Sequence, residues 1–271
     1  MRIRLFLAAC LLWAALLPAA AAPAPVLVLS VSGPIAPGSA DFVVRGIQRA
    51  AKEGAQLVVL QLDTPGGLDS SMRVIIKEIL ASPVPVATFV APGGARAASA
   101  GTYILYASHI AAMAPGTNLG AATPVQIGGL PSPTEPQKPK PKHDEQPAEG
   151  RAEQERAAEP AGGADAMSRK MVHDAAAYMR GLAQLRGRNA DWGELAVREA
   201  VSLSAAEALE KRVIDVVAED VPALLKRLDG RSLALHGEER VLDTAAAQVV
   251  TVEPDWRTRI LALVTDPNVA Y

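Results

Sequence analysis

The pattern of apolar residues after the first 25 positions constrains the fold most. Short apolar runs at residues 26–31, 57–62 and 84–90 alternate with helical periodicity at residues 40–52 and 70–80. The run at 57–62 does not alternate apolar with polar side chains, which indicates a strand buried on both faces of a sheet. The order strand, helix, strand, helix, strand predicts a parallel α/β core with right-handed crossovers.

The first 22 residues predict a signal for export through the inner membrane. Arg2 and Arg4 precede an apolar run at residues 5–17, and small residues follow at 19–22. This layout is typical of a cleaved secretory signal peptide, and the run is too short for us to expect a retained membrane anchor. Cys10, the one cysteine, lies in this leader. The mature chain would therefore have no disulfide or thiolate chemistry.

Composition divides the rest of the chain. Residues 128–164 are rich in Pro, Glu, Lys, Gln and Gly and nearly lack large apolar side chains, which predicts a disordered surface insert. The remaining chain, rich in Ala, Val, Leu and Ile, can bury one core.

The formal net charge of −2 predicts no nucleic-acid partner. Histidine and aspartate spacings match no metal site, so we expect no metal and no cofactor.

A serine among small residues is the main candidate nucleophile. Ser99 lies in the run GGARAASAGT at residues 93–102, between a glycine-rich strand exit and a helical pattern. The N-terminal dipole of that helix would favour negative charge nearby. The alternative interpretation is that Ser99 only caps the helix, which is an ordinary role for serine.

A second turn of small residues follows the strand at 57–62. Gly66 and Gly67 could present backbone N–H groups to an oxyanion, and Pro65 would fix the turn beforehand. The alternative is a tight strand-to-helix connection. Because both turns follow the carboxyl ends of parallel strands, we expect them on one rim of the sheet.

Acyl transfer also needs a base that is neutral at the working pH. Lys170 is the lysine in the ordered segment just after the predicted insert, and desolvation can make a lysine neutral. A solvated lysine on a helix surface is the alternative. His173 lies three residues later, on the same helix face, and is the second candidate base.

Several motifs, in order, resemble the NfeD family of membrane-bound serine proteases, which belong to the ClpP/crotonase superfamily. They are QLDTPGGL at 61–68, AASAGTY at 97–103, MAPGTNLG at 113–120, DAAAY at 174–178, GRN at 187–189, AVSLSAAEAL at 200–209 and VIDVV at 213–217. The resemblance implies a ClpP-like spiral of repeated ββα units. It also implies a serine protease domain at residues 23–230, interrupted by the insert.

The resemblance further implies residue roles and a substrate class. Ser99 takes the nucleophile position and Lys170 the base position of a Ser/Lys dyad, while the amides of Gly67, Leu68 and Ala100 take the oxyanion-hole positions. Similar proteins are endopeptidases without a cofactor that cut hydrophobic segments of membrane proteins such as stomatin-like partners. An extended hydrophobic peptide docked by strand addition, and a homodimer, are therefore expected.

Long family members continue into membrane helices and a small β-barrel domain. We therefore expect residues 231–271 to be a tail leading to a membrane region, with residues 249–252 forming a strand. The exported protein would be membrane-anchored at full length and soluble as given.

Two alternatives remain open, since fold alone does not decide function. One is a non-catalytic scaffold or partner of stomatin-like membrane proteins. The other is a crotonase-like acyl-CoA enzyme, against which the export signal argues.

Overall fold

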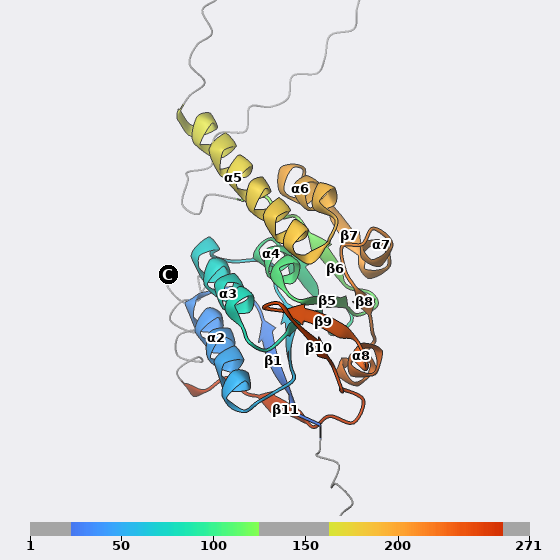
Figure 1. Ribbon diagram of the computed structural model, residues 1–271. Helices are drawn as coiled ribbons and strands as arrows, with labels where there is room; N and C mark the ends of the chain where they lie inside the picture. The colour runs from blue at the N-terminus through green and yellow to red at the C-terminus, as the bar shows by residue number, and fades with distance from the viewer. Residues whose placement is uncertain (1–22, 125–162, 257–271) are drawn as a thin grey trace, which may run out of the picture.

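The computed structural model describes residues 23–124 and 163–256 of the chain (Figure 1). The predicted signal peptide, nearly all of the predicted insert and residues 257–271 lie outside the described residues.

A six-stranded sheet runs through the centre of the molecule, with the strand order β11-β1-β2-β3-β5-β8. Every neighbouring pair in it is parallel. The strands are β1 (Val26–Ser32), β2 (Leu57–Asp63), β3 (Val86–Val90), β5 (Ile110–Met113), β8 (Val216–Val217) and β11 (Val249–Val252). The predicted parallel α/β core is confirmed.

Helices and a hairpin bury both faces of this sheet. On one face, Val58 and Leu60 of β2 pack into a core with α2 (Pro37–Lys52), α3 (Asp69–Ala81), α4 (Ala100–Ala107) and α5 (Gly163–Arg186). On the other face, Leu57 and Val59 pack with α8 (Val221–Leu228). Side chains alternate between the faces of a strand, so burial on both sides explains why the run at 57–62 is apolar throughout.

The C-terminal part of the described chain completes the sheet. The strands β9 (Ser232–Leu235) and β10 (Glu238–Val241) form an antiparallel hairpin. Leu242 next to this hairpin joins the second core together with Leu224 and Leu228. The predicted strand at 249–252 is confirmed as β11, which pairs in parallel with β1 at the edge of the sheet. The folded unit therefore continues to Val252, beyond the boundary at residue 230 that the sequence suggested.

A small second sheet stands next to the main one. Its strands are β4 (Arg96–Ala98), β6 (Asn118–Gly120) and β7 (Ser202–Ser204), where β6 pairs in parallel with β4 and antiparallel with β7. The helices α6 (Ala190–Arg198) and α7 (Ala205–Glu210) flank β7 in the chain. Because β3, β4 and α4 follow one another, they form one strand, strand, helix unit of the expected kind.

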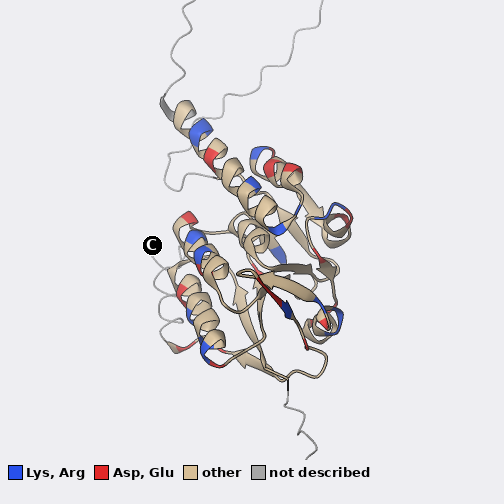
Figure 2. Cartoon of the chain, viewed as in Figure 1, with Lys and Arg blue, Asp and Glu red and all other residues tan. Residues whose placement is uncertain are grey.

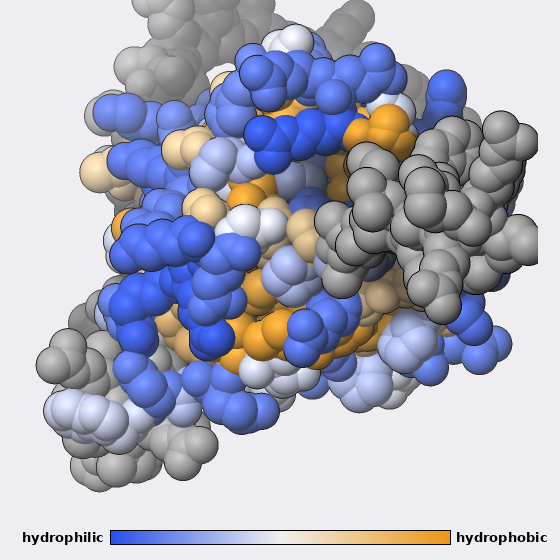
Figure 3. Space-filling model, turned by 60° about the horizontal axis from the view of Figure 1, so that its bottom comes forward, coloured by the Kyte–Doolittle hydropathy of each residue, from blue (hydrophilic) through white to orange (hydrophobic). Residues whose placement is uncertain are grey.

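Charged residues lie mainly on the helices and on the β9–β10 hairpin, whereas the central strands carry few (Figure 2). On the face shown in Figure 3, hydrophobic side chains gather in a central hollow and hydrophilic side chains surround them. Within the part of the chain that the structure describes, no helix is both long and apolar enough to cross a membrane.

Candidate active site

Ser99 occupies a sharp turn between β4 and α4. Its backbone angles, φ 50° and ψ −115°, lie in a region that residues other than glycine rarely adopt. Its amide donates to the carbonyl oxygen of Gly120 at 2.9 Å. Although Ser99 stands at the N-cap position of α4, its side chain makes no capping hydrogen bond. Strained strand-to-helix turns present the nucleophile in many hydrolases.

The glycine turn lies directly against Ser99. A Cβ atom added to Gly66 would lie 2.8 Å from the Cβ and 3.3 Å from the Oγ of Ser99. One added to Gly67 would lie 2.2 Å from the carbonyl oxygen of Ile35. The φ angles, 121° at Gly66 and 154° at Gly67, also favour glycine. The two turns thus meet at one place, as the sequence predicted.

Four segments of the chain share hydrogen bonds around this contact. The side-chain hydroxyl of the buried Thr64 accepts from the Gly66 amide at 3.1 Å and donates to the Gly66 carbonyl oxygen at 3.0 Å. Pro65 therefore does not fix the turn alone. The backbone bonds are Ile35 N to Gly66 O (2.7 Å), Thr64 N to Arg96 O (2.7 Å), Ala98 N to Thr64 O (3.0 Å) and Ser99 N to Gly120 O (2.9 Å).

The three expected oxyanion donors differ in availability. Across residues 23–124 and 163–256, the amides of Gly67 and Ala100 donate to no acceptor. The Ala100 amide is also the first of α4, where helix amides have no partner within the helix. The amide of Leu68, in contrast, already donates to the carbonyl oxygen of Ile35 at 2.8 Å. In this conformation the Leu68 amide, to which the family resemblance gave an oxyanion-hole position, thus already has an acceptor.

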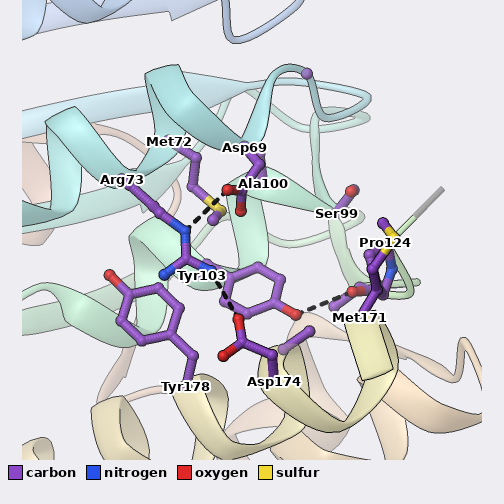
Figure 4. A pocket seen from close by; sticks show the side chains of 13 residues that line it. Asp69, Met72, Arg73, Ser99, Ala100, Tyr103, Pro124, Met171, Asp174 and Tyr178 are labelled. Carbon is purple, nitrogen blue, oxygen red and sulfur yellow. Dashed lines mark hydrogen bonds and ion pairs between the residues drawn. The ribbon is translucent and has the colours of Figure 1, made fainter. Parts of the chain in front are cut away.

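A pocket with a volume of about 540 Å³ opens beside Ser99 (Figure 4). It combines apolar side chains with a few charged ones, a composition suited to an extended peptide. Its lining consists of Gly67, Asp69, Met72, Arg73, Ser99, Ala100, Tyr103, Ala122, Pro124, Met171, Asp174, Ala175 and Tyr178.

Arg73 links two helices across the pocket wall. Its Nε donates to Asp69 on the same helix at 2.8 Å, and its Nη2 donates to Asp174 of α5 at 3.2 Å. The guanidinium carbon lies 4.5 Å from the centroid of the Tyr178 ring, within the range of a cation–π contact. No role for Arg73 was predicted from the sequence, although the four-residue spacing of Asp69 and Arg73 predicts an ion pair on a helix.

Tyr103 joins this wall to the loop after β6. Its ring stacks on that of Tyr178, with centroids 6.1 Å apart, and its hydroxyl donates to the Ala122 carbonyl oxygen at 3.1 Å. Burial raises the pKa of Tyr103 far above its ordinary value, so the hydroxyl remains protonated at neutral pH.

Lys170 lies on the exposed first half of α5, which projects beyond the rest of the molecule in Figure 1. Met171 and Asp174 of the same helix line the pocket, but Lys170 does not. The structure thus brings Ser99 to the pocket and α5 to its edge, while the exposed Lys170 lies outside the pocket lining. His173 is also exposed, and its Nδ1 lies 3.4 Å from Nη2 of Arg198, outside the pocket lining.

No group of three or more His, Cys, Asp or Glu side chains is placed to hold a metal ion among the residues with described positions.

A family model for the N-terminal domain of NfeD1b matches residues 25–232. The chain belongs to this NfeD1b family. It is 34% identical over 252 residues to "Membrane-bound protease PH1510" of Pyrococcus horikoshii, which covers 91% of the chain and 49% of the relative. It is 40% identical over 105 residues to "Membrane protein NfeD1b" of Bacillus subtilis, covering 38% of the chain and 23% of that protein. The chain thus matches no more than about half the length of either curated NfeD relative.

Solved structures of an NfeD relative share the fold. A serine-to-alanine mutant of "1510-N membrane-bound stomatin-specific protease" matches with a TM-score of 0.70 and 32% identity, over 86% of this chain and 100% of that one. A lysine-to-alanine mutant of the same protease, in complex with a substrate peptide, matches with a TM-score of 0.71 and 31% identity, over 90% and 99% of the two chains. These matches confirm the ClpP-like α/β fold expected for an NfeD domain.

Proposed function

We propose that this domain is the catalytic part of a serine endopeptidase that uses Ser99 as nucleophile and Lys170 as base. The observation that carries the proposal is the turn at Ser99. The backbone there is strained, and the Ser99 side chain makes no capping hydrogen bond but lines a pocket. Next to it are the amides of Gly67 and Ala100, which donate to no acceptor in the described residues. An ordinary N-cap serine would bond to its own helix and would need no strain.

The chemistry follows from these groups. Neutral Lys170 takes the proton of the Ser99 hydroxyl while Oγ bonds to the carbonyl carbon of a peptide, and the electron pair of the C=O bond moves to oxygen. The amides of Gly67 and Ala100 stabilise this oxyanion. Protonated Lys170 then gives its proton to the leaving amine as the C–N bond breaks. Water cleaves the resulting ester of Ser99 by the same steps and regenerates the serine.

This mechanism requires Lys170 to approach Ser99. Because Lys170 is exposed while its neighbour Met171 lines the pocket, a change in the Lys170 rotamer or in the first turns of α5 on substrate binding would supply the approach. Catalytic contacts are often longer before the substrate binds than in the Michaelis complex.

The substrate class, the partners and the location are part of the same proposal. An extended hydrophobic segment of a membrane protein suits the largely apolar pocket, and the names of the relatives favour a stomatin-like partner. We further propose that the chain is exported, that residues after 252 lead to a membrane anchor, that the catalytic domain starts at residue 23, and that it works as a homodimer.

The test uses the protein from residue 23 to 271 and a hydrophobic reporter peptide, with cleavage followed by mass spectrometry. A fluorophosphonate, which bonds to activated serines, reports the nucleophile independently of any substrate. The variants are Ser99→Ala and Lys170→Ala. The matched controls are Ser70→Ala, an exposed serine on α3, and Arg169→Ala, an exposed cation next to Lys170.

We expect cleavage to disappear in Ser99→Ala and Lys170→Ala, with unchanged circular dichroism, and to persist in both controls. The fluorophosphonate should label Ser99 in the wild type. Cleavage that survives in Ser99→Ala would refute the nucleophile, and cleavage that survives in Lys170→Ala would refute the base. If no form cleaves or is labelled, the non-catalytic partner becomes the better explanation.

A further inference from the structure

The position of Asp174 raises a problem for Lys170, if the proposed function holds. Asp174 follows Lys170 by four residues on α5, and side chains at this spacing are neighbours on a helix surface. A carboxylate beside an ammonium group favours its charged form. An Asp174 carboxylate with no other partner would therefore compete for Lys170, whereas a general base has to be free to accept a proton.

Arg73 of α3 binds the Asp174 side chain across the pocket wall. The guanidinium of Arg73 donates to Oδ2 of Asp174 at 3.2 Å. The Asp174 carboxylate forms no other hydrogen bond or ion pair in the described part of the chain, so it is directed toward α3. Figure 4 shows the Arg73 and Asp174 side chains reaching toward each other across the pocket wall.

Arg73 is itself held in place. Asp69 binds its Nε at 2.8 Å, one helical turn away on α3, and the Tyr178 ring lies 4.5 Å from its guanidinium carbon. Tyr178 in turn stacks on Tyr103 of α4, the helix that begins directly after Ser99. The guanidinium therefore has a fixed position relative to both the nucleophile turn and α5.

Other charged and titratable groups near Lys170 do not substitute for Arg73. On α5, Arg169 is exposed and His173 points to Arg198 of α6. Glu194 of α6 is bound by both Arg180 and Arg198. Apart from Lys170, the charged and titratable groups described on the packed elements are Asp69, Arg73, Lys77 and Glu78 of α3, Tyr103 and Tyr106 of α4, Arg169, His173, Asp174, Tyr178, Arg180 and Arg186 of α5, and Asp191, Glu194 and Arg198 of α6.

We infer that Arg73 is a positioning residue for the base: it withdraws the Asp174 carboxylate from Lys170 and ties α5 to α3 at the pocket. The Asp69, Arg73 and Asp174 side chains are 68%, 37% and 73% exposed, so water weakens each interaction and the effect is modest.

The test compares the pH dependence of kcat/KM in the wild type, Arg73→Met, Asp174→Asn and the double variant. Methionine keeps an unbranched side chain on the Tyr178 ring and removes the charge. In parallel, the reactivity of Lys170 toward acetic anhydride is followed against pH by mass spectrometry, which requires no substrate. Lys52 and Lys226 serve as internal references, and Arg49→Met, which breaks the exposed Arg49–Glu53 pair at the C-terminal end of α2, is the matched control.

We expect Arg73→Met to move the acid limb of kcat/KM, and the labelling curve of Lys170, upward by roughly 0.2–0.4 of a pH unit. The double variant should return both to the wild-type position, because the competing carboxylate is gone. If Arg73 had a purely structural role, Arg73→Met would lower activity at all pH values. Adding Asp174→Asn would then not restore the activity. Curves that stay in place in Arg73→Met, or stay displaced in the double variant, would overturn the inference.

The two proposals fail in different ways. If Lys170→Ala cleaves like the wild type, the dyad is wrong whatever Arg73 does. If Lys170→Ala is inactive and the Lys170 labelling curve does not respond to Arg73, the dyad stands and the role of Arg73 is refuted.

Discussion

Replacing Gly66 with alanine tests whether the position of Ser99 controls activity. The new methyl group would lie 2.8 Å from the Cβ of Ser99. Ordinary contacts begin at 3.4 Å, so Ser99 and residue 66 have to separate by about 0.6 Å. A misplacement of about 1 Å can cost roughly 100-fold in rate. We therefore expect kcat to fall about 10- to 100-fold.

Gly33→Ala is the matched control. Gly33 has a φ of 101°, close to the 121° of Gly66, but a Cβ there would meet nothing within 4 Å. Both variants carry the backbone strain of alanine at positive φ, about 1–3 kcal/mol. Urea denaturation should show similar losses of stability, while the reporter-peptide assay should show a large loss of activity only in Gly66→Ala. Equal activities in two equally destabilised variants would refute the reasoning.

Three further predictions concern stability. Ser99→Gly should be more stable to urea than Ser99→Ala by about 1 kcal/mol, because only alanine keeps the strain at φ 50°; equal stabilities would contradict this. Burial lowers the pKa of His109 to about 3, from 6.5. The unfolded chain then binds the extra proton, so stability should fall as the pH drops from 6.5 toward 3, by at most about 1.4 kcal/mol per pH unit, and His109→Gln should reduce this slope. Leu224→Ala, at a fully buried site, should cost about 2–5 kcal/mol in thermal or urea unfolding, and a neutral result would show that α8 does not support the sheet.

The sequence predicted the core strands well because their side chains are buried on both faces. The helix predicted at residues 40–52 begins earlier in the structure, at Pro37, because proline suits the first turn of a helix. The predicted strand at 84–90 begins only at Val86. The Ser82 hydroxyl accepts from the amide of Val84, and Pro85 has no amide to donate, so a turn occupies this stretch.

The site was less predictable where it depends on distant residues. The motifs indicated Ser99 and the glycine turn, and the structure brings them together. Arg73 and Asp174 are 101 positions apart, and no local pattern connects them. The use of the Leu68 amide by Ile35 likewise depends on how two loops meet, which periodicity and residue type do not encode.

The hydrogen bonds that join the loops at Ile35, Thr64, Ala98 and Ser99 also determine how this region opens. Each loop uses backbone groups of another as partners, so one cannot leave without exposing the unpaired amides of the rest. Protein segments coupled in this way unfold locally as one cooperative unit. The amide hydrogens at these four positions should therefore exchange with solvent at similar rates, and a peptide long enough to bridge the turns would slow all of them together.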